Sequence, residues 1–205
     1  MDSLTAALAF LQQPWLAVPI CGAVVAGLWW RGWRWTAVYV ALMPLINWSF
    51  AAVPTFPIAE ALGGGQFQPL AIVTGLVLVA RDFTQREIGH RVLGAMLIGL
   101  ALSTLTSWIT IVVASAAAFL ISETVDWAVY TLSRRPLSQR IMISSLLSAP
   151  LDQTVFIWLA SLVVPGIFAW GTVLTGIASK LVGAAAVAWV VAREERRVAA
   201  RATAG

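Results

Sequence analysis

Four ionisable side chains lie inside long apolar stretches of the sequence, where a charge is costly. These are Glu123, Asp126, Asp152 and Lys180, and Lys180 is the single lysine of the chain. On insertion scales a charge at the centre of a bilayer costs about 2.5–3.5 kcal/mol, so such residues serve a ligand, an ion or a buried partner. Three acids and one base at similar depth predict either a polar binding site or an ion-pair network that only fixes helix register.

The spacing of the acids favours a site for a flat ligand that donates hydrogen bonds. Glu123 and Asp126 stand three residues apart, and therefore on one face of a helix. Aromatic residues continue this stripe, and a second stripe around Asp152 repeats its order of serine, aspartate and aromatic residue. Carboxylates would accept hydrogen bonds from the ligand, and the rings would stack on it. The predicted substrate-binding residues are Glu123, Asp126, Trp127, Tyr130, Asp152, Phe156 and Lys180.

A further buried pair is predicted at Arg81 and Asp82. Only Leu70–Ala80 precedes them as unbroken apolar sequence, which is about 16 Å of helix. The two side chains should therefore lie within the inner leaflet and face protein or a water-filled cavity. Asn47 is another polar residue at depth, and its most direct use is a hydrogen bond between helices.

The composition indicates a protein that needs a membrane around it. Of the 205 residues, 60% are hydrophobic and 11% are charged, whereas a soluble domain carries about 25% charged residues. Continuous apolar runs favour helices over a transmembrane β-barrel. The formal net charge of +4 would suggest a nucleic-acid partner for a soluble protein. Here the arginines stand between apolar runs, so we expect a lipid bilayer and no nucleic acid.

The elements that position these side chains are predicted to form an all-α bundle of about seven transmembrane helices. The fourth and fifth spans share one apolar block, which is divided at Ser103–Trp108 because the whole is too long for one crossing. An extra N-terminal span (residues 1–35) precedes a six-helix core (36–192) and a basic cytoplasmic tail (193–205). The spans are Trp15–Trp30, Thr36–Val53, Gln68–Glu87, Val92–Ser107, Ile109–Leu132, Ile141–Val164 and Ile167–Ala192.

Motifs of catalysis and of cofactor binding are absent from the sequence. It contains no Walker A motif, no H-E-x-x-H and no G-x-S-x-G. One cysteine, Cys21, and one histidine, His90, offer little for a zinc or haem site. We therefore expect no enzyme activity, no cofactor and no metal.

The order of the motifs resembles the queuosine precursor transporters, also called the putative vitamin uptake transporter family. The matching motifs are Val79–Gly89, Ser122–Asp126, Asp152–Phe156 and Lys180, within Thr36–Ala192. The resemblance implies a carrier of the bacterial inner membrane that imports the 7-deazaguanine bases preQ0 and preQ1. It also implies functional positions at Asp82, Glu123, Asp126, Asp152 and Lys180.

A deazaguanine base suits the chemistry of the predicted site. Its guanine-like edge presents an N–H and an NH2 that match the two oxygens of a carboxylate, and the aminomethyl cation of preQ1 suits a second carboxylate. Asp126 and Asp152 are therefore expected to bind the base, and Lys180 to pair with an acid when the site is empty. Glu123 lies one turn deeper than Asp126, beside no cation in sequence, and is expected to carry a coupling proton.

Two other functions stay open on the sequence alone. The chain would be the substrate-binding subunit of an energy-coupling-factor importer if small-residue faces, such as Ala114–Ala118 and Gly183–Ala186, dock a separate ATPase. It would be a membrane enzyme if it turned over a lipid without net transport. A homodimer is also left open.

The arginine pattern predicts the topology. Arginines follow the first, third, fifth and seventh spans, and the other connections hold no Lys or Arg. Because cytoplasmic loops are enriched in basic residues, we expect the N-terminus outside and the C-terminus in the cytoplasm. Alkaline phosphatase fused before Met1 should be active, and green fluorescent protein fused after Gly205 should fluoresce. A periplasmic C-terminus would contradict this scheme.

Overall fold

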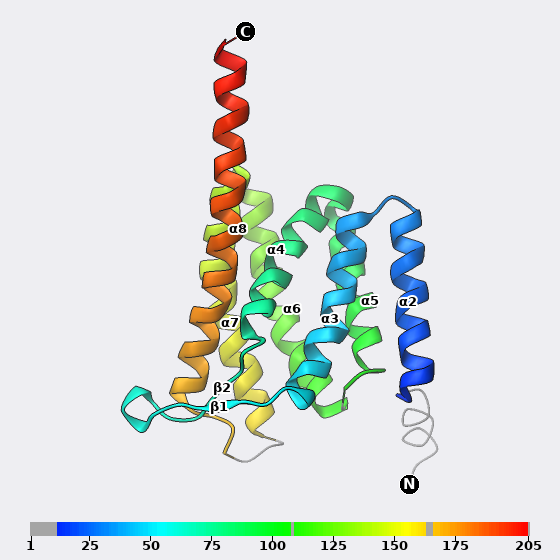
Figure 1. Ribbon diagram of the computed structural model, residues 1–205, viewed down its shortest axis with the longest axis vertical. Coiled ribbons are helices and arrows are strands. Elements are labelled where there is room, and N and C mark those ends of the chain that lie inside the picture. The colour runs from blue at the N-terminus through cyan, green and yellow to red at the C-terminus, as the bar shows by residue number, and fades with distance from the viewer. Residues whose placement is uncertain (1–11, 108, 163–165, 205) are drawn as a thin grey trace.

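The chain folds into a bundle of α-helices, which a computed structural model describes over residues 12–107, 109–162 and 166–204 (Figure 1). The helices are α2 (Pro14–Trp30), α3 (Arg34–Ala52), α4 (Ala71–Ile88), α5 (Val92–Ser103), α6 (Ile109–Leu132), α7 (Leu137–Ser161) and α8 (Trp170–Ala204). Two turns of 3₁₀-helix, Glu60–Leu62 and Gly89–Arg91, and two strands, β1 (Phe56–Pro57) and β2 (Gln66–Phe67), are also described.

Helices occupy the apolar stretches in which spans were predicted. α6 has the predicted bounds, and most other bounds shift by a few residues. α8 differs most, because it continues as one helix to Ala204 through the tail that was predicted to follow Ala192. Residues 1–11 of the predicted N-terminal segment, Trp108 at the predicted break and Val164 at the end of the sixth span lie outside the described residues.

Hydroxyl side chains bond to backbone carbonyls at the break between α5 and α6. Ser103 Oγ donates to the Gly99 carbonyl at 2.9 Å, and Thr104 Oγ1 donates to the Ala101 carbonyl at 2.7 Å. Such side-chain bonds compete with the backbone bonds that would continue the helix. α5 ends at Ser103, and turns lead through Ser107.

Three described helical segments are long and apolar enough to cross a membrane: Val112–Leu132, Leu137–Ser161 and Trp170–Ala202. α2 is apolar but shorter. α5 has 12 residues, or about 18 Å of helix against a hydrocarbon core of about 30 Å. The chain is thus an all-α membrane protein, and the count of seven crossings stays a prediction.

The bundle has a compact centre and one peripheral helix. α6 packs on α7, α7 on α8, α8 on α4, and α4 on α3. α2 packs mainly on α3 and stands at one edge (Figure 1). The connections α2–α3 and α4–α5 and the exposed end of α8 lie at one end of the bundle, called here the arginine end (Figure 1). The strands lie at the opposite end, called here the hairpin end.

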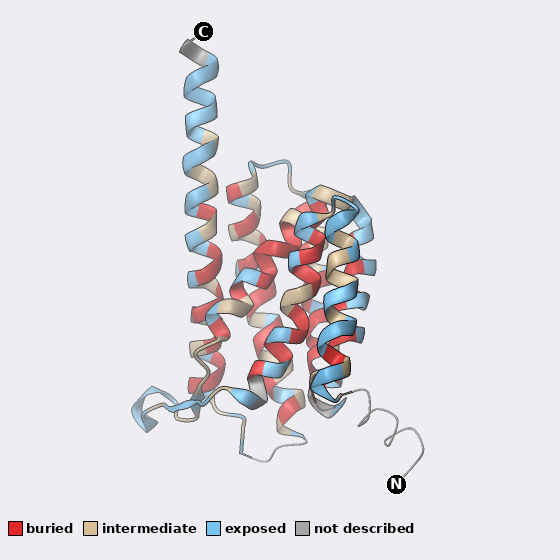
Figure 2. Cartoon of the chain, turned by 45° about the vertical axis from the view of Figure 1, so that its right-hand side comes forward, coloured by how far each residue is buried: buried red, intermediate tan, exposed pale blue. Residues whose placement is uncertain are grey.

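The bundle buries polar residues and exposes apolar ones, as Figure 2 shows by the buried inner faces of its helices. Buried polar residues include Thr84, Ser122, Ser144 and Ser148. Large apolar side chains such as Trp158 are exposed on the outside. In water this arrangement would be unfavourable, because apolar surface is stabilised by removal from water. A lipid environment favours it.

The β1–β2 hairpin is fastened to the start of α8. Gly171 N–H donates to the Gly63 carbonyl at 3.2 Å, and Gln66 N–H donates to Thr172 Oγ1 at 2.9 Å. Gly63 has a φ of 92°, which favours glycine. The chain leaves β2 directly into Gln68, so this contact also fixes where Gln68 enters the bundle.

α4 and α8 approach each other closely because a glycine stands at their contact. A Cβ on Gly75 would meet the backbone carbonyl of Lys180 and lie 2.9 Å from its Cα. Gly183, one turn further along α8, faces the Gly75 backbone in the same contact. Small residues of this kind let helix backbones approach in membrane proteins. The contact sets the position of Lys180.

We expect Gly75→Ala to separate α4 from α8 and to destabilise the protein by about 1–3 kcal/mol, a typical cost of overpacking. Gly94→Ala is the matched control, because nothing lies within 4 Å of a Cβ at Gly94 on α5. There the added methyl group should stabilise the helix by about 0.5–1 kcal/mol. Thermal unfolding of the detergent-solubilised protein measures both changes. Equal stability of the two variants would contradict the close contact.

Candidate functional site

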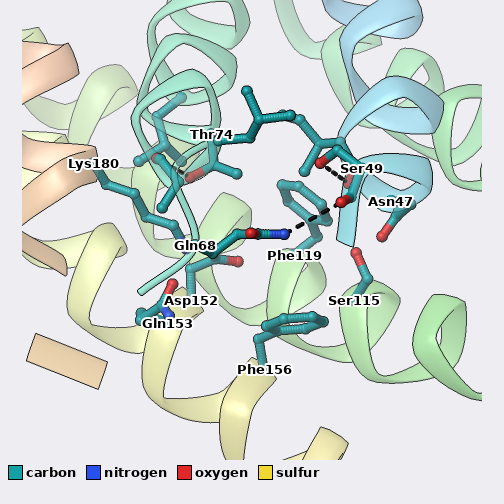
Figure 3. A pocket seen from close by; sticks show the side chains of 14 residues that line it. Asn47, Ser49, Gln68, Thr74, Ser115, Phe119, Asp152, Gln153, Phe156 and Lys180 are labelled. Atoms are coloured by element: carbon teal, nitrogen blue, oxygen red, sulfur yellow. Dashed lines mark hydrogen bonds and ion pairs between the residues drawn. The ribbon is translucent and has the colours of Figure 1, made fainter. Parts of the chain in front are cut away.

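Two polar groups of residues lie one above the other inside the bundle. The first, the polar cavity, is bounded by α3, α4, α6, α7 and α8 (Figure 3). The second, the Arg81 cluster, consists of Arg81 and Asp82 on α4 and Glu123 and Asp126 on α6. Residues 71–78 of α4 border the cavity, and Arg81 follows them. The cluster therefore lies between the cavity and the arginine end.

The guanidinium of Arg81 contacts all three carboxylates of its cluster. Nε donates to Glu123 Oε2 at 3.0 Å. Nη1 donates to Asp82 Oδ1 at 2.9 Å, and the same nitrogen lies 3.3 Å from Asp126 Oδ2. The four side chains are at most 1% exposed. Since each buried ion loses several kcal/mol of hydration, the carboxylates depend on this one cation.

The cluster contains more acceptors than Arg81 satisfies. Among the described residues, Glu123 Oε1 and both oxygens of Asp126 are buried and accept no hydrogen bond. The hydroxyl of Tyr39 on α3 is also buried without a hydrogen bond, although it lies beside Glu123. With three ionised carboxylates and one guanidinium, the cluster would carry a formal charge of −2.

The polar cavity is lined by amides from three separate elements. Its cavity volume is about 60 Å³. Asn47 on α3, Gln68 before α4 and Gln153 on α7 supply the amides (Figure 3). The rings of Phe119 and Phe156 also line it. Hydrogen-bonding groups between aromatic rings can hold a flat polar molecule.

Two amide atoms of the cavity have no hydrogen-bond partner among the described residues. Gln68 Nε2 donates to the Ser49 carbonyl at 3.2 Å, but Gln68 Oε1 and Asn47 Nδ2 are buried without a bond. An unsatisfied buried polar atom costs about 1–3 kcal/mol. One acceptor and one donor among the residues that line the cavity therefore keep an unused capacity for a hydrogen bond.

An ion pair between α7 and α8 closes one side of the cavity. Lys180 Nζ donates to Asp152 Oδ2, and Ser122 Oγ donates to Asp152 Oδ1 at 3.3 Å. Both ionic side chains are less than 10% exposed. Ser122 directly precedes Glu123 on α6, so a single step along α6 joins the cavity to the Arg81 cluster.

The structure divides the sequence-predicted residues among three places. Asp152, Phe156 and Lys180 line the polar cavity. Asp82, Glu123 and Asp126 lie in the adjoining Arg81 cluster, so all three are buried ion partners. Their predicted roles in binding, and the coupling role of Glu123, stay predictions.

Trp127 and Tyr130 lie apart from the cavity, although they continue the stripe of Glu123 and Asp126. Trp127 Nε1 donates to His90 Nδ1 at 3.0 Å, and the Tyr130 ring lies under the Arg140 guanidinium at 5.1 Å. Both contacts point toward the arginine end. The predicted stacking of these rings on a ligand in the cavity therefore has no support from their positions.

Sequence reasoning missed several cavity residues and the central role of Arg81. Gln153 follows Asp152 in a quoted motif, so the motif itself held this signal. Asn47 was predicted to bond between helices, but its Nδ2 is unpaired. The other unpredicted cavity residues are Ile46, Ser49, Gln68, Leu70, Ala71, Thr74, Leu78, Ser115 and Phe119.

Several of the small residues considered for docking an ATPase are used inside the chain, whereas Ala185 and Ala186 are exposed. Gly183 faces α4, where a Cβ would lie 2.9 Å from the Ile72 carbonyl. Ala114, Ala118 and Ala184 are buried. An ATPase partner and a homodimer stay predictions that these surfaces do not support.

We expect Arg81→Gln to destabilise the protein by about 3–5 kcal/mol, because it leaves buried carboxylates without a cation. Adding Glu123→Gln and Asp126→Asn to this variant should restore part of the loss by removing the stranded charges. Arg197→Gln is the control, since Arg197 pairs with Glu194 on an exposed surface of α8, where such pairs contribute about 0–1 kcal/mol. Chemical unfolding in detergent measures the three changes. Equal effects of Arg81→Gln and Arg197→Gln would contradict a central role for Arg81.

The comparison with known families agrees with this architecture. Residues 65–193, more than half of the chain, match the family model described as putative vitamin uptake transporter. The matched region includes α4 to α7 and α8 up to Arg193, and with them Gln68, the Arg81 cluster and the Asp152–Lys180 pair. No curated protein and no solved structure matches the chain. The chain therefore belongs to the putative vitamin uptake transporter family.

Proposed function

We propose that the protein imports a 7-deazaguanine base, such as preQ0 or preQ1, through the polar cavity. The observation that carries this proposal is the pairing of unsatisfied amide atoms with a carboxylate in one buried space. Membership of an uptake family supports transport as the activity. The choice of a deazaguanine comes from the resemblance of the motifs to the queuosine precursor transporters, and the chemistry of the cavity is compatible with it.

A guanine-like base offers complementary groups to this cavity. Its N–H and NH2 donors suit the Asp152 carboxylate or Gln68 Oε1, and its carbonyl oxygen suits Asn47 Nδ2. The rings of Phe119 and Phe156 provide apolar surface for its two faces.

The Asp152–Lys180 ion pair would differ between the substrate-bound and the empty state of the cavity. In the structure Lys180 Nζ donates a hydrogen bond to Asp152 Oδ2. A base that donates to Asp152 competes with Lys180, and the aminomethyl cation of preQ1 can take over its charge. Loss of the internal ion pair offsets part of the gain from binding, so the substrate is held less tightly and can leave.

Transport in this proposal is coupled to an ion or proton gradient. The Arg81 cluster, which lies between the cavity and the arginine end, is the group that we assign to coupling. The orientation that supports import places the hairpin end outside and the arginine end in the cytoplasm.

Asp152→Asn should weaken preQ1 binding about 10- to 100-fold, because the change keeps size but removes a charged acceptor worth about 1.5–3 kcal/mol. Glu194→Gln, on the exposed part of α8, is the control. Uptake of radiolabelled preQ0 and preQ1 by cells that lack their own carrier, and binding to the purified protein, measure the effect. Unchanged uptake by Asp152→Asn would reject the cavity as the binding site. Absence of uptake by the wild type would reject these substrates.

A further inference from the structure

The charge count of the Arg81 cluster leaves two carboxylates without a compensating cation. Asp82 and Asp126 contact the same nitrogen, Nη1 of Arg81, so they are close neighbours. Two adjacent buried carboxylates do not both ionise at low cost, and such pairs share a proton in other proteins. A bound metal ion is a poor alternative, because Arg81 already fills the centre. Moreover, the described residues contain no group of three or more His, Cys, Asp or Glu side chains placed to hold a metal ion.

The hydrogen bonds distinguish Asp126 from the other two acids. Glu123 accepts from Arg81 Nε at 3.0 Å, and Asp82 accepts from Arg81 Nη1 at 2.9 Å. Among the described residues Asp126 accepts no hydrogen bond at either oxygen, although it is completely buried. The cationic contact of Asp126, Arg81 Nη1 at 3.3 Å, is longer than the Arg81 contacts of Glu123 and Asp82, so it stabilises an ionised Asp126 less. A protonated carboxyl group carries no charge and needs only one acceptor for its O–H group.

The hydroxyl of Ser144 on α7 can be that acceptor. Ser144 Oγ donates toward Asp82 Oδ2 at 3.5 Å and also lies beside Asp126. A hydroxyl both donates and accepts, so a protonated Asp126 can donate to Ser144 while Ser144 donates to Asp82. The unpaired hydroxyl of Tyr39 on α3 is a second, independent polar group directed at this cluster.

We propose that Asp126 binds an exchangeable proton in the Arg81 cluster, and that this proton couples the uptake described above. The step is reversible protonation of one carboxylate oxygen, which changes the formal charge of the cluster from −2 to −1. The coupling part rests on the proposed function, whereas the proton site does not.

Release of the proton has a mechanical consequence. Ionised Asp82 and Asp126 then repel each other across Arg81, at the point where α4 and α6 are joined. The charged and titratable groups that face Asp126 are Tyr39 on α3, Arg81 and Asp82 on α4, and Glu123 on α6. Asp152 on α7 acts on Glu123 of the same cluster. Asp152 is itself paired with Lys180 of α8, so occupancy of the cavity changes the field at the cluster.

Infrared spectroscopy of the full-length protein in lipid tests the proton site directly. At neutral pH the wild type should show the C=O stretch of a protonated carboxyl group that shifts in D2O, and Asp126→Asn should remove it. Asp152→Asn, which changes a carboxylate outside the cluster, should retain the band. Asp126→Glu should keep a band at a shifted frequency, which covers the case that Asp126→Asn does not fold. A band that survives in Asp126→Asn, is unshifted in Asp126→Glu, or is lost only in Glu123→Gln overturns the proposal.

Uptake into proteoliposomes across which a pH gradient is imposed tests the coupling of preQ1 transport to protons. The readout is the ratio of preQ1 uptake with acid outside to uptake without a gradient. We expect a ratio above one for the wild type and the Glu194→Gln control, and a ratio near one for Asp126→Asn. Loss of the infrared band without any preQ1 uptake by the wild type would refute the proposed function and support the proton site. Gradient-dependent uptake by Asp126→Asn would refute the coupling role of Asp126.

Discussion

The ion contacts of Arg81 connect two helices that are not direct neighbours. α4 packs on α3 and α8, and α6 packs on α7. The side chain of Arg81 spans the interior from α4 to reach Glu123 and Asp126 on α6. In a low-dielectric interior these contacts are strong, but they are balanced against the cost of removing every charge from water. The connection between α4 and α6 below the arginine end therefore depends on the ion pairs of one side chain.

The surrounding bundle is built so that this arrangement can persist. Gly75 and Gly183 bring α4 and α8 together at the level of Lys180, and buried hydroxyls such as Ser144 and Ser122 reach the carboxylates. Apolar association alone gives helices in lipid little reason to choose one partner over another, because lipid tails are equally apolar. Close contacts at small residues and internal ion pairs supply the specificity that apolar surface cannot.

The sequence predicted the helices well because each is an apolar run that is separated from the next by charged residues, prolines or glycines. It also indicated which charged residues lie at depth, including Arg81 and Asp82. It did not predict the polar cavity, because Asn47, Gln68 and Gln153 come from separate elements and no single periodicity brings them together. The stripe of Glu123 to Tyr130 illustrates a related limit. Residues seven apart share a face but lie about 10 Å apart along the helix, so Tyr130 is at a different depth from Glu123.

The helix α8 is continuous from the cavity to a point beyond the rest of the bundle, so it can act as a stiff rod. From Lys180 to Ala204 the helix runs without interruption, about 36 Å, and its last turns project from the arginine end (Figure 1). The tight contact at Gly75 makes a natural pivot near one end of this rod. A tilt of only about 5° there would displace the far tip by about 3 Å. A small tilt at this contact would therefore move the projecting end of α8 much further than it moves Lys180.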